Sequence, residues 1–402
     1  MYILGSFLFM PMVVWEARAQ GYASYCVARV FAGLFSAWSQ TVPPATIADI
    51  FVVEVRGRKM STFAIPVVIG PVIAPLFCAA IQYKTGEWRN IFYFNLGLAF
   101  LQFLLCLFIP ETLWNEDADR APVTSTDDGK TLPTLHASDK HGDYHVETAA
   151  APVSTTSPGH VGPAFMPWRE WGRFGRVCAG PFIMLKYLCI DIASFYYGIC
   201  FGFLSVGITV VAPQTLDRPP FSFKPIPLGC AFLAFGIGGL LGKWSGGIVG
   251  DKTVAYFERK NSQRQPEDRL WALYPMLPLM FIGCLLVGLQ LQLGLHWMCL
   301  LVGGAIAFFA LSGSTGILQT YTLESYVARS MDTQAVFNFW KCMWGFVTPF
   351  FCMLWGLKDG WIATYCAQGA ILLGLGLIVN TFLIYKGYNL RRRQGMPIIE
   401  KN

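Results

Sequence analysis

Arg29 is the residue whose position most directly suggests chemistry. It lies in the middle of an apolar, helix-length stretch, residues 26–51. Gly33 and Ala37 follow at four-residue steps, so small residues share its helix face and a neighbouring helix can approach closely. An ionisable residue inside a membrane span is costly and by default indicates a functional site. The alternative is a structural arginine that snorkels or pairs with a carboxylate.

The composition indicates a membrane protein. Hydrophobic residues make up 54% of the chain and charged residues 13%, and 40 glycines are spread through the apolar segments. A soluble enzyme is therefore excluded. The net charge of +6 does not predict a nucleic-acid partner, because the basic residues flank hydrophobic runs instead of forming one basic face. The lipid bilayer is the expected environment.

Ten apolar runs approach the roughly 17–25 residues that a helix needs to cross a hydrocarbon core. They cover residues 2–16, 23–48, 61–82, 90–110, 181–211, 226–248, 271–292, 296–322, 333–356 and 361–386. Four precede a long polar segment and six follow it. The sequence thus predicts an all-α, polytopic membrane bundle of about ten spans.

Four regions follow from this count. They are an N-terminal membrane half of four spans (1–112), a polar linker (113–178), a C-terminal membrane half of six spans (179–388) and a tail (389–402). The linker is rich in Ser, Thr, Pro, Asp and Gly and lacks apolar periodicity, so we expect it to be disordered. His141 and His145 within it have the spacing of a helical metal pair, but Gly142 and Asp143 disfavour a helix there. No metal or cofactor is expected.

The asymmetry of Lys and Arg predicts the orientation. The segments on one predicted side carry three basic clusters, around residues 56–59, 252–269 and 386–401, whereas the loops of the other side are poor in basic residues. The positive-inside rule therefore places both termini, the linker and loop 249–270 in the cytoplasm.

The order of short motifs resembles the major facilitator superfamily, most closely its fungal drug:proton antiporter branch. Arg29, Gly33 and Ala37, then residues 43–49 (PPATIAD) and a basic cluster at 56–59, resemble the family's fourth span. Residues 266–271 (PEDRLW) resemble the fungal antiporters that are related to cation and polyamine transporters. The resemblance implies alternating access between two six-span halves, with proton entry driving export and Arg29 as a coupling group.

The resemblance begins at the family's third span. The sequence therefore predicts a first half that lacks the family's first two spans, through a shortened gene product or a misplaced start. With two wall helices and one gating loop missing, we expect the 402-residue chain not to catalyse net transport.

Residues 69–75 (IGPVIAP) resemble the antiporter signature G-P-x-x-G-P, with Ala74 in place of the second glycine. Gly70, Pro71 and Pro75 remove side-chain volume and backbone hydrogen bonds, which allows a kink. In the family such a kink is thought to favour exchange over leak. A purely structural kink is the alternative.

In the second half, Gly238, Gly242, Gly246 and Gly250 form a four-residue ribbon along one helix face, which predicts close helix packing. The ribbon ends at Asp251 and Lys252, which match the front of the family's G-x-x-x-D-[RK] gating loop. The resemblance implies that Asp251 holds the cytoplasmic gate. A helix C-cap with flanking charges is the alternative.

Asp191 and Glu324 are the acids placed in or at the end of second-half spans, where a carboxylate can alternately bind a proton or a cationic substrate. Each could instead pair structurally with Lys186, Lys243 or Lys341. With Arg29, Asp191, Glu324 and Lys341 are the residues predicted to line the cavity and couple protons.

The resulting prediction is a proton-coupled efflux transporter for a small organic compound, with both termini cytoplasmic and the plasma membrane as its location. The partners expected are a small-molecule substrate, protons and lipid. Uptake of a cation or polyamine is one alternative, and a non-transporting remnant or receptor-like membrane protein is another. The chain lacks the phosphate-binding motif G-x-x-x-x-G-K-[ST], which disfavours transport driven by nucleotide hydrolysis.

Overall fold

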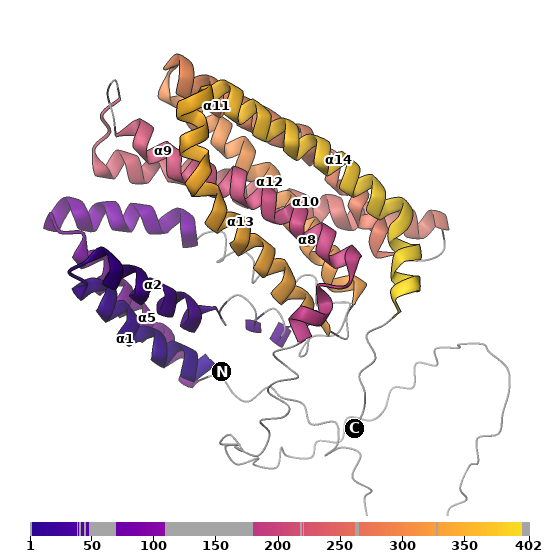
Figure 1. The fold of residues 1–402 in the computed structure, drawn as a ribbon, viewed down its shortest axis with the longest axis horizontal. Helices are drawn as coiled ribbons and strands as arrows, with labels where there is room; N and C mark the ends of the chain where they lie inside the picture. Colours follow the sequence, from indigo (N-terminus) through magenta and orange to yellow (C-terminus); the bar gives the residue numbers. More distant parts are fainter. Residues whose placement is uncertain are drawn as a thin grey trace, which may run out of the picture. The chain divides into compact units, whose positions relative to one another are not determined.

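A computed structural model describes residues 2–37, 39, 42–43, 46–47, 70–108, 180–217, 219, 221–261, 265–326 and 329–395. The predicted linker, 113–178, lies outside these residues, as do the four histidines within it. Every regular element in the described ranges is a helix (Figure 1). The all-α prediction is confirmed.

The N-terminal part contains α1 (Tyr2–Arg18), α2 (Tyr22–Ser36), a helix over residues 70–85 and α5 (Arg89–Leu107). Helix α1 packs against both α2 and α5. Apolar sequences of this kind form helices in lipid because a helix satisfies each backbone hydrogen bond within its own segment.

The C-terminal part begins with α8 (Leu188–Cys200), which continues through the π-helix η2 (Phe201–Gly207) into α9 (Ile208–Leu216). Next come α10 (Pro225–Asn261), the 3₁₀ helix η3 (Pro266–Leu273) and α11 (Met276–Leu293). The chain ends with α12 (Trp297–Ser325), α13 (Ser330–Asp359) and α14 (Trp361–Gln394). Helix α10 packs along α12, α11 packs against α12 and α14, and α8 packs against α13.

Six apolar helical stretches in the described ranges are long enough to cross a bilayer. They are Arg89–Leu107, Leu188–Leu216, Pro225–Lys260, Pro266–Leu293, Trp297–Ser325 and Trp361–Gln394. Helix α13 has 30 residues, and thus the required length, but is more polar.

Among the helix boundaries that differ from the prediction, two lie near predicted site residues. The fifth run, expected from 181, is interrupted by a turn at 185–186 before α8 begins at Leu188. Residues 249–261, expected as part of a loop, continue α10 instead. Asp251 and Lys252 therefore lie on a helix, and the prediction that they form a loop is wrong; helix-compatible residues follow them, including Ala255 and Glu258.

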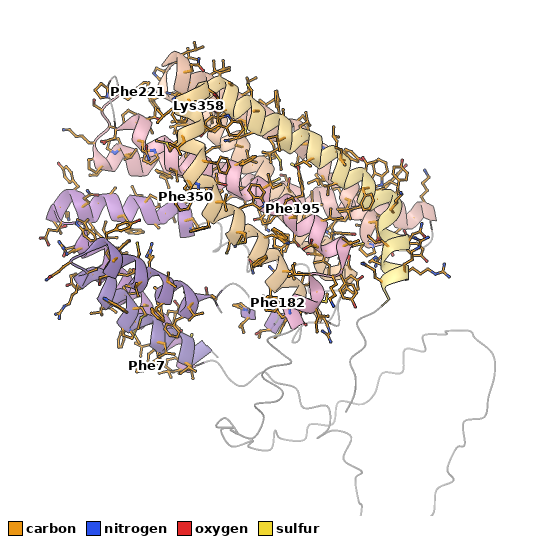
Figure 2. The ribbon with its side chains drawn as sticks, viewed as in Figure 1. Phe7, Phe182, Phe195, Phe221, Phe350 and Lys358 are labelled. Carbon is orange, nitrogen blue, oxygen red and sulfur yellow. The ribbon has the colours of Figure 1, made fainter. Side chains whose placement is uncertain are left out.

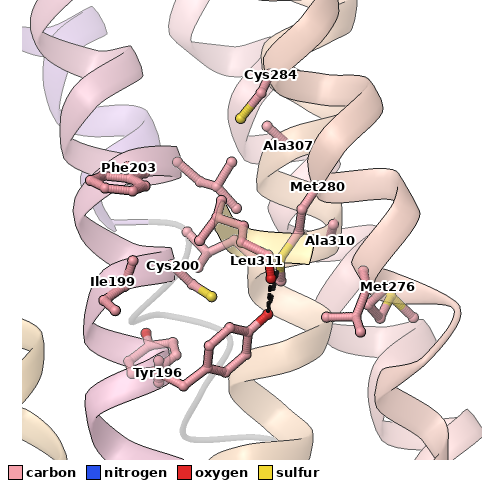
Figure 3. Close-up of a cluster of buried hydrophobic side chains, with 14 of the residues drawn as sticks. Tyr196, Ile199, Cys200, Phe203, Met276, Met280, Cys284, Ala307, Ala310 and Leu311 are labelled. Atoms are coloured by element: carbon pink, nitrogen blue, oxygen red, sulfur yellow. Dashed lines mark hydrogen bonds between the residues drawn. The ribbon is translucent and has the colours of Figure 1, made fainter. Parts of the chain in front are cut away.

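The core of the C-terminal part lies among α8, α11, α12 and α14. Its side chains include small and sulfur-containing groups such as Cys200, Met280 and Cys284 (Figure 3). The hydroxyl of Tyr196 donates to the Leu372 carbonyl oxygen at 3.1 Å, which satisfies a buried polar group by reaching across to α14. Gly376 leaves the space that this ring occupies.

Glycines also end two of the helices. Gly294 has φ +61° and its N–H donates to the Gln290 carbonyl, which closes α11 with a left-handed residue. Gly360, with φ +89°, separates α13 from α14, and the Ile362 N–H beyond it donates to Gln292 Oε1 at 2.8 Å. Both turns join helices that pack against each other.

Candidate functional site

Arg29 forms an ion pair with Glu16. Its Nη1 lies 3.1 Å from Glu16 Oε2 and 3.3 Å from Oε1, which joins α2 to α1. The Glu16 side chain is 1% exposed and that of Arg29 is 60% exposed. The carboxylate is thus buried among apolar groups and depends on this guanidinium for its charge compensation. Arg29 thus pairs with a carboxylate, as the structural alternative in the sequence analysis expected. A role of this pair in proton coupling is neither required nor excluded by the contact.

Arg269 connects two of the predicted acidic site residues. Its Nη1 donates to Asp251 Oδ1 at 2.9 Å and its Nη2 donates to Glu324 Oε1 at 3.1 Å. The arginine is 8% exposed, whereas Asp251 is 74% exposed and Glu324 29% exposed. This ionic cluster joins α10, η3 and the end of α12. Lys252 lies beside it in sequence and is exposed.

A second pair lies close in sequence to the ionic cluster. The Arg391 Nε and Nη2 atoms donate to the two carboxylate oxygens of Glu267 at 2.8 and 2.7 Å, in the bidentate geometry that gives strong charge-assisted bonds. Glu267 is 4% exposed. The pair fixes the end of α14 to η3, so α10, α12, η3 and α14 are tied together at one end of the C-terminal part.

Asp191 and Lys341 have aromatic neighbours. The Trp340 Nε1–H donates to Asp191 Oδ1 at 2.7 Å, which joins α8 to α13. Lys341, the next residue, places its Nζ 5.6 Å from the centroid of the Phe201 ring, a cation–π distance. The structure thus places Asp191 between α8 and α13, and it places Lys341 of α13 against η2.

The predicted glycine ribbon is a packing face. A side chain at Gly238 or Gly242 would collide with the backbone of Ala305 or Phe309 on α12, and one at Gly246 would meet Gly313. Gly250 faces Arg269. The ribbon therefore brings α10 against α12 and leads directly into the ionic cluster.

Gly70, Pro71 and Pro75 lie in the helix over residues 70–85. A side chain at Gly70 would meet no atom within 4 Å. Close packing in the described residues therefore does not explain the glycine at this position. The kink remains a prediction.

Sequence reasoning gave no site role to several residues that complete these contacts, among them Glu16, Glu267 and Arg269. Each had a signal. Glu16 is an acid at the end of an apolar run, and the other two belong to the quoted PEDRLW motif. Spacing along one helix identifies a face, but it does not identify the residue on another helix that this face meets.

A cavity of about 310 Å³ lies elsewhere, at the ends of α9, α11 and α13. Gln214, Gln290 and Trp361 are among its uncharged lining residues. None of the predicted site residues lines it.

Long apolar helices joined by buried ion pairs define a multi-pass membrane protein. Residues 1–349 match the family model of the Major Facilitator Superfamily, and the chain belongs to that family. Family membership makes it a transporter of a small-molecule substrate and not an enzyme.

Similar proteins are fungal transporters. An uncharacterized transporter of Schizosaccharomyces pombe is 26% identical over 99% of this chain and 76% of its own length. The multidrug transporter TPO1_1 of Candida glabrata is 25% identical over 93% of this chain, and the transporter penM of Penicillium rubens is 23% identical over 84%. The matches span 60% and 62% of the length of these last two relatives.

Proposed function

We propose that the protein exports a small organic compound in exchange for protons by alternating access. The Arg29–Glu16 ion pair is the observation that supports proton coupling most directly. A carboxylate that is 1% exposed and bound to a cation can be neutralised by one proton, which weakens its attraction to the guanidinium. Protonation would thereby release α2 from α1, and loss of the proton would restore the pair.

The second half contributes the remaining coupling and gating residues of this proposal. Asp191, Glu324 and Lys341 bind protons or substrate groups, and Asp251 with Lys252 gates the cytoplasmic end. Arg269 supports the gating role because it links Asp251 to Glu324 on another helix. Gly70, Pro71 and Pro75 supply the kink that limits leak.

The arrangement of the chain is part of the proposal. Residues 1–112 and 179–388 form the two membrane halves, 113–178 form a cytoplasmic linker and 389–402 a cytoplasmic tail. The protein resides in the plasma membrane with both termini inside. The printed name of the Candida glabrata relative, a multidrug transporter, supports efflux as the direction.

Reconstitution of the 402-residue chain in vesicles tests this function. A proton gradient is imposed, and proton flux is followed with a trapped pH-sensitive dye while a panel of small organic compounds is added one by one. A compound-dependent proton flux that reverses when the gradient is reversed would support the proposal and would contradict the expectation from the sequence that the 402-residue chain does not catalyse net transport. Compound movement at the same rate with and without the gradient would contradict proton coupling. Binding of compounds without any movement would support the non-transporting alternative.

A further inference from the structure

Lys243 is an ionisable residue in the middle of a long apolar helix. It is the nineteenth of the 37 residues of α10 and is partly buried. Eight residues separate it from Asp251, which corresponds to about 12 Å along a helix. A lysine at this depth in a span is costly unless an anion or water compensates its charge.

The buried and half-buried carboxylates in the described C-terminal part already have partners. Glu324 and Asp251 bind Arg269, Glu267 binds Arg391, and Asp332 lies 3.6 Å from Arg329. Asp191 accepts from the Trp340 indole. Within the described ranges, the ion pairs shorter than 4.0 Å use arginines only, so Lys243 is left without a carboxylate partner there.

Open space adjoins the lysine. A Cβ atom built on Gly316 of α12 would lie 3.9 Å from both Cδ and Nζ of Lys243, and no other heavy atom outside its own helix turn would lie within 4 Å. Gly242, which faces the same helix α12, would instead collide with backbone. The two helices are therefore tightly packed along the ribbon but leave room beside Gly316, and the ammonium group of Lys243 borders that room.

Aromatic rings of α8, η2 and α13 lie near this part of α12. Thr315, the neighbour of Gly316, lies beside the hydroxyl of Tyr197 on α8. The Tyr197 ring stacks on Phe337 of α13 with centroids 4.4 Å apart, and it lies 6.3 Å from Phe201, the ring below Lys341. Tyr197 and Phe337 are buried, at 5% and 2% exposed, whereas Phe201 is half-buried, so Phe201 with Lys341 is the part of this group that a ligand could meet.

We propose that the space beside Gly316 binds the acidic group of an amphipathic organic anion, with Lys243 as the residue that recognises its carboxylate. This substrate class rests on the proposed transport function and makes it more specific. A cation or polyamine is disfavoured, because it would leave Lys243 uncompensated and add a like charge close to it.

Two xanthene dyes of similar size and opposite charge test the proposal: fluorescein, an anion at pH 7.4, and rhodamine 6G, a cation. Binding to the purified chain in phosphatidylcholine nanodiscs is measured by fluorescence anisotropy, with empty nanodiscs subtracted. No proton gradient is present. Failure of transport therefore does not affect this readout, and failure of anion binding does not decide whether transport occurs.

We expect fluorescein to bind and Lys243→Gln to raise its Kd by about tenfold, equivalent to ~1.4 kcal/mol. Lys243→Arg should retain most of the affinity, because the positive charge is kept. Lys260→Gln removes an exposed cation from the end of the same helix and should leave the Kd unchanged. Gly316→Val should weaken fluorescein binding with the lysine intact, because the added methyl groups fill the space.

Several results would overturn the proposal. One is binding of rhodamine 6G alone, or of neither dye. Another is equal fluorescein affinity in the wild type and Lys243→Gln. A loss of affinity that is the same for Lys243→Gln and Lys260→Gln would show a general effect of surface charge and would equally contradict a site at Lys243.

Discussion

The acidic residues of this protein differ in how deeply they are buried and in how their charge is compensated. Glu16 and Glu267 are almost completely buried and each has one arginine partner, whereas Asp251 is largely exposed although it binds the same arginine as Glu324. A buried charge that loses its partner is strongly destabilising, while an exposed pair contributes little. The same carboxylate-to-amide substitution should therefore lower stability by different amounts at these acidic residues.

Variants of the Arg29–Glu16 pair distinguish coupling from structure. Arg29→Ala leaves Glu16 as a buried, unpaired carboxylate and should lower stability, by less than about 3 kcal/mol because the arginine is 60% exposed. The double variant Arg29→Ala, Glu16→Gln should recover the melting temperature in detergent. If the pair couples protons, the double variant still inserts but lacks pH-dependent transport. Normal pH-dependent transport by either variant would contradict the coupling role.

The ionic groups at the end of the C-terminal part should rank by burial. Glu267→Gln removes one partner of a bidentate, buried pair and should cost about 3 kcal/mol. Glu324→Gln should cost less, and Asp251→Asn less than about 1 kcal/mol. Thermal unfolding of the purified variants measures the order, with exposed Glu258→Gln as the control. A larger loss for Asp251→Asn than for Glu267→Gln would contradict it.

At the scale of elements, the sequence predicts most helices because hydrophobic length alone determines where a chain can cross a bilayer. The continuation of α10 beyond residue 248 was missed, because charges near Asp251 end an apolar run without ending a helix. Ion-pair partners were also missed. Arg269 lies between Asp251 and Glu324 because of the way α10, η3 and α12 pack. The periodicity of residues along one helix carries no information about this packing.

The glycine ribbon gives a prediction about helix packing. Gly242→Leu places a branched side chain against the backbone of Phe309 and should cost about 3 kcal/mol or more through overpacking. Gly247→Leu is the matched control on the same helix, because a side chain there meets no atom within 4 Å. The monodisperse fraction on size exclusion in mild detergent should fall for the first variant only. Leu241→Ala, at an exposed position, should also be tolerated.

At the scale of the whole molecule, the structure gathers charge at one end of the C-terminal part. The Glu267–Arg391 pair and the Arg269 cluster join α10 and η3 to the ends of α12 and α14 there. The opposite end carries Lys224, before α10, and Lys358, at the end of α13; Figure 2 shows Lys358 near Phe221. With 37 residues, α10 is about 55 Å long, which exceeds the roughly 30 Å hydrocarbon core.

Lysine labelling of intact cells tests the resulting orientation. Lys224 and Lys358 are exposed at one end, and Lys252 and Lys260 are exposed at the other. Because the basic residues near Lys260 indicate the cytoplasmic side, a membrane-impermeant amine-reactive biotin ester should modify Lys224 and Lys358 only. After permeabilisation, Lys252 and Lys260 should be modified as well, and peptide mass spectrometry identifies each site. The permeabilised sample is the control for reactivity. Modification of Lys260 in sealed cells, with Lys358 protected, would reverse the orientation and place the ionic cluster at the extracellular end.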